Sequence, residues 1–208
     1  MSHPQDTTIP LPRKQPKQAR SKALVEAVIE SCLQILDSEG EAALTSQRIS
    51  EVSGASIGSI YQYFPNKDAM VAAVYAQILD REAADVHSRH QQFATLPLPV
   101  LLREVLGNII RVERRLFQLH AAFHLRYHSA LHLGMWNGEH PSAMAFIEAT
   151  WLPLLEMYQD EVHTPDPKLA AYLLVKGLRG MIRSVLEEVP EQLDSPALLD
   201  ALVAMALG

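Results

Sequence analysis

No feature constrains the fold of this chain more than residues 45–67, TSQRISEVSGASIGSIYQYFPNK. Thr45 is a favourable N-cap for a short helix, and Gly54 stands where that helix must end. Ser56 can cap a second helix, which Pro65 terminates. Two short helices joined by a glycine-containing turn are the sequence form of a helix-turn-helix, a device that places its second helix in the major groove of DNA.

The apolar side chains of this stretch recur at helical spacing. Ile49 and Val52 should face inward from the first helix, and Ile57, Ile60 and Phe64 should face inward from the second. The remaining positions of the second helix are small or polar and are therefore free to face DNA.

One of these outward positions is Gly58, which costs a helix interior roughly 1 kcal/mol relative to Ala. A glycine there is explained if the DNA must approach the helix backbone closely. We expect Thr45, Tyr61 and Lys67 to hold phosphates and the outward residues to read base edges. The full set predicted to contact DNA is Arg20, Thr45, Arg48, Ser56, Gly58, Ser59, Tyr61, Gln62, Tyr63 and Lys67.

Residues 20–80 resemble the N-terminal DNA-binding domain of the TetR/AcrR family of bacterial repressors. The resemblance is carried by Ile49–Ser50–x–x–Ser53–Gly54–Ala55–Ser56–x–Gly58 and by Ile60–Tyr61–x–Tyr63–Phe64–x–x–Lys67–Asp68. Departures from the family pattern occur at Ser50, Ser53, Ala55 and Met70, all small or volume-tolerant changes at packing positions. The resemblance implies an all-α chain in which an N-terminal three-helix head is linked by a long helix to a C-terminal helical domain.

Charge and proline content divide the chain further. The net charge is −6, yet residues 1–22 carry five Lys or Arg against the single Asp6, which favours DNA contact at one end only. Residues 1–19 hold four prolines and predict a disordered basic arm. We therefore expect the helix-turn-helix domain over 20–66 and an effector-binding and dimerisation domain over 67–208.

In TetR-like proteins the C-terminal domain holds a small-molecule pocket, and ligand binding releases the operator. Residues 116–133, LFQLHAAFHLRYHSALHL, predict a largely apolar helix interrupted by histidines. Few polar groups on an apolar wall are typical of a ligand pocket, although a plain packed core gives the same pattern. The predicted ligand-binding residues are Phe117, His120, His124, Tyr127 and Trp151.

The histidines at 120, 124, 128 and 132 recur every four residues, a spacing at which two imidazoles can share one metal. Each four-residue step also drifts by about 40° around a helix, so only neighbouring pairs could do so. We predict neither a metal site nor a cofactor. A metal- or haem-sensing regulator that uses such a pair remains the alternative.

The last two predicted helices are apolar on more than one face. They cover residues 168–187 and the segment PALLDALVAMALG, and neither pattern suits a helix alone in water. The resemblance implies a homodimer through about residues 168–207, whose symmetry would match paired half-sites on DNA. The other interpretation is that both helices only close the core of one subunit.

The sequence argues against other classes of protein. It contains no nucleophile elbow and no phosphate-binding glycine loop, and Glu113, His120 and His124, the candidates for a helical metal-dependent enzyme, are poorly spaced. A DNA-binding adaptor that responds to a protein partner is a further alternative.

Cys32 lies on an apolar stripe and is expected to be a buried thiol. With no leader-like or membrane-spanning segment expected, we predict a cytoplasmic protein. The resemblance to the TetR/AcrR family implies a repressor rather than an activator.

Overall fold

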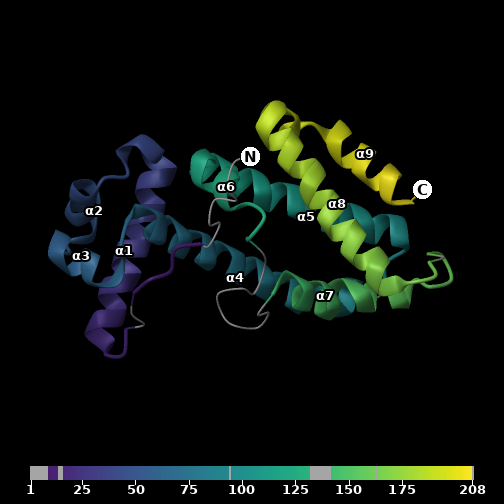
Figure 1. The fold of residues 1–208 in the computed structure, drawn as a ribbon, viewed down its shortest axis with the longest axis horizontal. Coiled ribbons are helices and arrows are strands. Elements are labelled where there is room, and N and C mark those ends of the chain that lie inside the picture. Colours follow the sequence, from purple (N-terminus) through teal and green to yellow (C-terminus); the bar gives the residue numbers. More distant parts are fainter. Residues whose placement is uncertain (1–8, 14–15, 94, 132–141, 163, 208) are drawn as a thin grey trace, which may run out of the picture. The chain divides into compact units, whose positions relative to one another are not determined.

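The computed structural model describes residues 9–13, 16–93, 95–131, 142–162 and 164–207. In these ranges it has nine α-helices, two short 3-10 helices and no strand, which confirms the predicted all-α class (Figure 1). No helix in the described ranges combines the length and the apolar character needed to cross a membrane.

The helices follow one another with short connections. The N-terminal elements are α1 (Ala19–Ser38), η1 (Glu41–Ala43), α2 (Ser46–Ser53) and α3 (Ile57–Tyr63). They are followed by α4 (Lys67–Phe93), α5 (Leu98–Leu119), α6 (Ala121–Tyr127) and α7 (Ala143–Met157). The chain ends with α8 (Pro167–Glu188), η2 (Pro190–Asp194) and α9 (Pro196–Leu207).

Contacts within the chain group it into two compact units. The first contains the described residues up to Ile78 together with Leu116–Ala130, and the second contains Leu79–Arg115 and the described residues from Leu131 onward. The boundary therefore falls inside α4 rather than at residue 66, and a segment of the expected effector domain folds with the head. Helices α4 and α5 each contribute to both units.

The core of the first unit is built from the inward faces predicted for its short helices. Helix α1 supplies Cys32 and Ile35, α2 supplies Ile49, and α3 supplies Ile60, all of them completely buried. Helices α1, α2 and α3 contact one another in all three pairings, and Figure 1 shows them gathered as a bundle. Helix α3 is thereby held by its inner face, which leaves its outer face free.

The second unit is held by two apolar clusters. One brings together Phe93, Leu98, Leu101 and Tyr158. The other joins Ile147 and Trp151 of α7 to Ala171 and Val175 of α8. Helices α7 and α8 pack on each other, and α8 also contacts η2.

One predicted helix is wrong. Residues 116–133 do not form a single helix, because α5 ends at Leu119 and α6 begins only at Ala121. His120 adopts φ −158° and ψ 86° as the N-cap of α6 and accepts a hydrogen bond from the Phe123 N–H through Nδ1. The Tyr75 hydroxyl donates to the carbonyls of Leu116 and His120 on the two sides of the break, at 2.5 and 3.2 Å.

The break also removes the predicted column of four histidines from a single helix. His120 is the N-cap of α6, His124 lies within it and His128 is its C-cap. His132 lies outside the described residues. The rings of His124 and His128 are buried with centroids 5.3 Å apart, so only this pair keeps the spacing that suggested a metal.

Candidate functional site

The ends of α2 and α3 are fixed by the residues that the sequence predicted. The Thr45 hydroxyl accepts a hydrogen bond from the Arg48 N–H at 3.1 Å, and the Ser56 hydroxyl accepts one from the Ser59 N–H at 3.2 Å. Gly54 has φ 69° and ψ 3°, the left-handed conformation that glycine adopts most readily. The turn between the helices is thus determined locally, and it sets the direction of α3.

The outer face of α3 carries Gly58 and Gln62, both exposed, and the half-buried Ser59. A Cβ atom built on Gly58 would have no neighbour within 4 Å. Nothing in the described chain therefore requires a glycine at this position. The space that a side chain would fill is open to a binding partner.

Ile57 does not face inward as predicted, because 44% of it is exposed. It is the first residue of α3 and lies beside Gly58 on the outside of the head. The sequence pattern could not reveal this, since the spacing from Ile57 to Ile60 and Phe64 fits an inward face equally well. An exposed isoleucine on such a helix can contact the methyl group of thymine.

Besides the capping hydroxyls of Thr45 and Ser56, the side chains of Tyr61 and Arg48 are engaged within the head. The Tyr61 hydroxyl shares a 2.6 Å hydrogen bond with the Ser46 hydroxyl, which ties α3 to α2. The Arg48 guanidinium pairs with Glu39 at 2.9 Å and with Glu51 at 3.2 Å. Hydrogen bonds from Arg48 lower the pKa of the Glu39 carboxyl, and the same bonds raise the pKa of Arg48.

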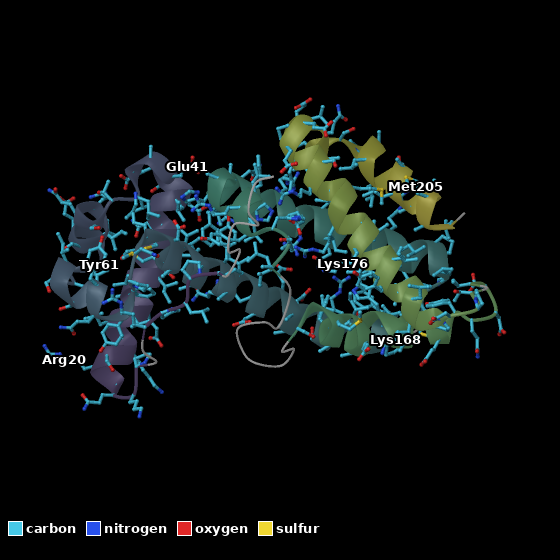
Figure 2. All side chains as sticks on the ribbon, in the orientation of Figure 1. Arg20, Glu41, Tyr61, Lys168, Lys176 and Met205 are labelled. Atoms are coloured by element: carbon cyan, nitrogen blue, oxygen red, sulfur yellow. The ribbon has the colours of Figure 1, made fainter. Side chains whose placement is uncertain are left out.

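The remaining predicted DNA-binding residues lie on the surface of the first unit. Lys67 is exposed at the first position of α4, Tyr63 is half-buried at the end of α3, and Arg20 is exposed at the start of α1. Figure 2 shows the Arg20 side chain extending away from α1.

A part of the N-terminal arm contacts the end of α3, although disorder was expected over residues 1–19. The Arg13 N–H donates to the Tyr63 carbonyl at 2.7 Å. Ile9 is buried with 6% exposed, whereas Leu11 is 56% exposed. The sequence signal for this contact was weak, since proline-rich segments lack helical or strand periodicity.

The structure divides the predicted ligand-binding residues between the two units. Phe117, His120, His124 and Tyr127 belong to the first unit, and Trp151 belongs to the second. Within the first unit only Phe117 and His124 are brought together as rings, with centroids 6.4 Å apart.

The other two residues of this group contact the head. His120 Nδ1 lies 3.0 Å from Glu41 Oε2, and the Tyr127 hydroxyl donates to Asp68 Oδ2 at 3.3 Å. Arg126 pairs with the same Asp68 oxygen at 3.3 Å. Helix α6 is therefore joined to the first turn of α4 through Asp68, and His120 lies beside η1.

Trp151 is 7% exposed in the aliphatic cluster of α7 and α8. Its Nε1–H is buried and has no hydrogen-bond partner among the described residues. A buried donor without a partner costs on the order of 1–3 kcal/mol, and a ligand oxygen could satisfy it. Glu113, a candidate for the enzyme alternative, is buried in the same unit with Arg179 Nη1 3.8 Å from its Oε1.

Comparison with known proteins agrees with this geometry. Residues 28–74 match the family model of bacterial regulatory proteins of the tetR family. The nucleoid occlusion factor SlmA of Glaesserella parasuis is 28% identical over 103 residues, which cover 49% of this chain and 49% of SlmA. The chain thus aligns with about half the length of that relative.

Solved structures share the fold over most of the chain. A TetR-family transcriptional regulator from Mesorhizobium loti superposes with a TM-score of 0.56 at 18% identity, over 90% of this chain and 98% of that one. RolR in complex with resorcinol gives a TM-score of 0.56 at 16% identity, over 91% and 90%. The fatty acid degradation regulator FadR from Bacillus halodurans gives 0.51 at 15%, over 93% and 97%.

At these identities the structural likeness concerns the fold alone. The family match, in contrast, covers the capped helices, the Gly54 turn and the open face of α3. The described head over residues 28–74 therefore matches the bacterial regulatory proteins of the tetR family.

Proposed function

We propose that this regulator is a repressor, which binds a palindromic operator as a homodimer and leaves it when a small molecule binds. The observation that carries the proposal is the outer face of α3. Three of its exposed residues are Ile57, Gly58 and Gln62, on a helix whose N-terminus is capped and whose inner face is buried. Such a helix is ready to enter a major groove without rearrangement.

We divide the DNA-contacting residues by role. Gln62, Ser59 and Ile57 would read base edges, since an amide, a hydroxyl and an apolar group each match a different major-groove feature. Thr45, Ser56, Tyr63, Lys67 and Arg20 would hold phosphates and orient the head. Arg48 and Tyr61, which bond within the head, would act by positioning α2 and α3.

Dimerisation is proposed through α8 and α9. The exposed positions of α8 recur every three or four residues at Leu169, Leu173, Gly177 and Gly180, which places them on one helix face. A Cβ built on either glycine would meet nothing within 4 Å. Met205 of α9 is also exposed, and Figure 2 marks it on that helix. Burial against a second copy would remove this apolar surface from water.

The effector is proposed to bind in the second unit at Trp151. RolR, which shares the fold, binds resorcinol, a small molecule with hydrogen-bonding oxygens. The unpaired Trp151 N–H could donate to such an oxygen while the aliphatic cluster contacts the apolar part of the ligand.

We propose no catalytic activity. The matched family and the neighbours in fold are regulators, and the Glu113 carboxylate of the enzyme alternative is paired with Arg179. The histidine-based metal sensor stays the alternative, since the buried rings of His124 and His128 have centroids 5.3 Å apart.

The test begins with selection of duplexes from a randomised pool by the purified protein. We expect a two-fold symmetric sequence whose affinity exceeds that of random duplex by at least a hundredfold, with a steep dependence on salt. Sedimentation should show one dimer on each selected duplex. Enrichment of no sequence, or binding without salt dependence, would overturn the proposal.

A further inference from the structure

The described part of the N-terminal arm, residues 9–13, is attached to the end of α3. Helix α3 ends at Tyr63, and the last carbonyls of a helix receive no hydrogen bond from an N–H of the same helix. The Tyr63 carbonyl instead accepts the Arg13 N–H at 2.7 Å. The arm therefore completes the C-terminal end of the recognition helix.

Two features make this attachment specific. Ile9 is buried, although residues 9–13 have no regular secondary structure, so the arm makes apolar contact as well as the hydrogen bond. Pro10 and Pro12 each restrict φ and lack an N–H, which lowers the entropy lost when the segment docks. A freely moving tail would show neither burial nor a backbone bond to one particular carbonyl.

The attachment places positive charge beside the DNA-facing helix. Arg13 is exposed next to its bond with Tyr63, and Lys17 and Arg20 follow it on the exposed surface leading into α1. Neither Arg13 nor Lys17 forms an ion pair with another described residue. Phosphate oxygens are the natural partners of such cations beside a helix that enters the major groove.

We propose that the docked segment Ile9–Arg13 is a second element of the DNA interface, which fixes Arg13 against a phosphate flanking the bases read by α3. This inference rests on the proposed DNA-binding function. It differs from charge attraction by a mobile tail because it requires the docking of Ile9, a residue without charge.

The experiment compares variants on the duplex selected by the wild-type protein and on a random 30-base-pair duplex, by fluorescence anisotropy across a salt series. Arg13→Ala should weaken binding to both duplexes by at least threefold. It should lower the slope of log affinity against log salt by about 0.9 for each arm that loses a phosphate. Arg81→Ala, which removes a positive charge from the second unit, is the matched control and should leave both quantities unchanged.

The docking of residues 9–13 is tested with substitutions of uncharged residues. Ile9→Ser should reproduce the loss of slope, whereas Leu11→Ser, the same kind of change at an exposed position of the same segment, should have no effect. Truncation of residues 1–10 removes no Lys or Arg and removes one acidic residue, Asp6, so its charge change alone would strengthen binding. It should nevertheless weaken binding as Ile9→Ser does, which keeps the test valid if that variant folds poorly. Amide exchange at Arg13 should be slow in the wild type and fast in the truncated protein.

The outcomes separate the ideas involved. If Arg13→Ala weakens binding while Ile9→Ser and the truncation do not, the arm acts as a mobile charge and docking is wrong. An unchanged slope in all three variants means that the arm does not touch DNA. Failure of the wild type to select any duplex would refute the proposed function itself, independently of the arm.

Discussion

At the residue scale, the clearest functional signal is a side chain that is missing. Gly58 lies in a helix where alanine would be favoured, and the surrounding chain leaves room for a Cβ. Intrinsic propensity and local packing both argue for a larger residue, so the glycine is explained by something outside the chain. We propose close approach of DNA as that explanation.

We therefore expect Gly58→Ala to separate folding from DNA binding. The variant should unfold at the same temperature as the wild type or higher, with up to about 1 kcal/mol of added stability. Its affinity for the selected duplex should fall by at least tenfold. Gly107→Ala serves as a control, because its Cβ would make only an ordinary 3.6 Å contact with Leu199 and it lies outside the head. Equal loss of affinity in both variants would contradict the assignment.

Cys32 allows a prediction about pH. Burial raises the pKa of its thiol from 9.0 to about 12. Between these values the unfolded chain loses the thiol proton while the folded chain keeps it, so the folded state loses stability as pH rises. The loss should approach about 1.4 kcal/mol per pH unit. Urea unfolding of the wild type and Cys32→Ala between pH 8 and 10.5 should show a steeper decline for the wild type, and parallel curves would refute the shift.

At the element scale, the break between α5 and α6 is the feature that most changes the interpretation of the chain. It joins residues 116–130 to the head through the Tyr75 hydroxyl, Asp68 and Glu41. Tyr75 and Leu116 are more than forty positions apart in the sequence, so no local pattern encodes their contact. The histidines consequently serve as caps and contact residues instead of lining one continuous helix.

Removal of the Tyr75 hydroxyl should loosen this segment. Tyr75→Phe removes the side-chain donor to the Leu116 and His120 carbonyls, each of which keeps a backbone N–H donor, and should cost about 1 kcal/mol of stability. Hydrogen exchange should accelerate in residues 116–130 and stay unchanged in α2. Tyr158→Phe is the matched control, since that hydroxyl donates to the Leu96 carbonyl at 2.5 Å within the second unit. Faster exchange of 116–130 in both variants would show that the link is not specific to Tyr75.

At the scale of the whole molecule, the apolar surface of α8 has no cover within the described chain. Leu173 is 59% exposed and Leu169 is 52% exposed on the same face as the two glycines. A second copy that covers this face would also bring a second head to the DNA, which a palindromic operator requires.

Leu173→Glu should therefore yield a monomer, since a charge would have to be buried without a partner in the dimer. Sedimentation should show the monomer at micromolar concentration, and affinity for the selected palindrome should fall by at least a hundredfold. Circular dichroism should remain that of a folded protein. Val100→Glu places the same charge on an exposed apolar position of α5 and should stay dimeric. A dimeric Leu173→Glu protein would exclude this face as the interface.

The sequence alone determined the helix-turn-helix, because its caps, its glycine turn and its apolar spacing act within a few residues of one another. Thr45, Gly54 and Ser56 behave as predicted for that reason. Helices α8 and α9 also match their predicted ranges, since prolines set their starts. Tertiary structure alone decided the exposure of Ile57, the break at His120, the docking of Ile9 and the orphan Trp151 N–H. Each of these depends on which residues distant in sequence come near the position and which do not, and local patterns carry no information about that.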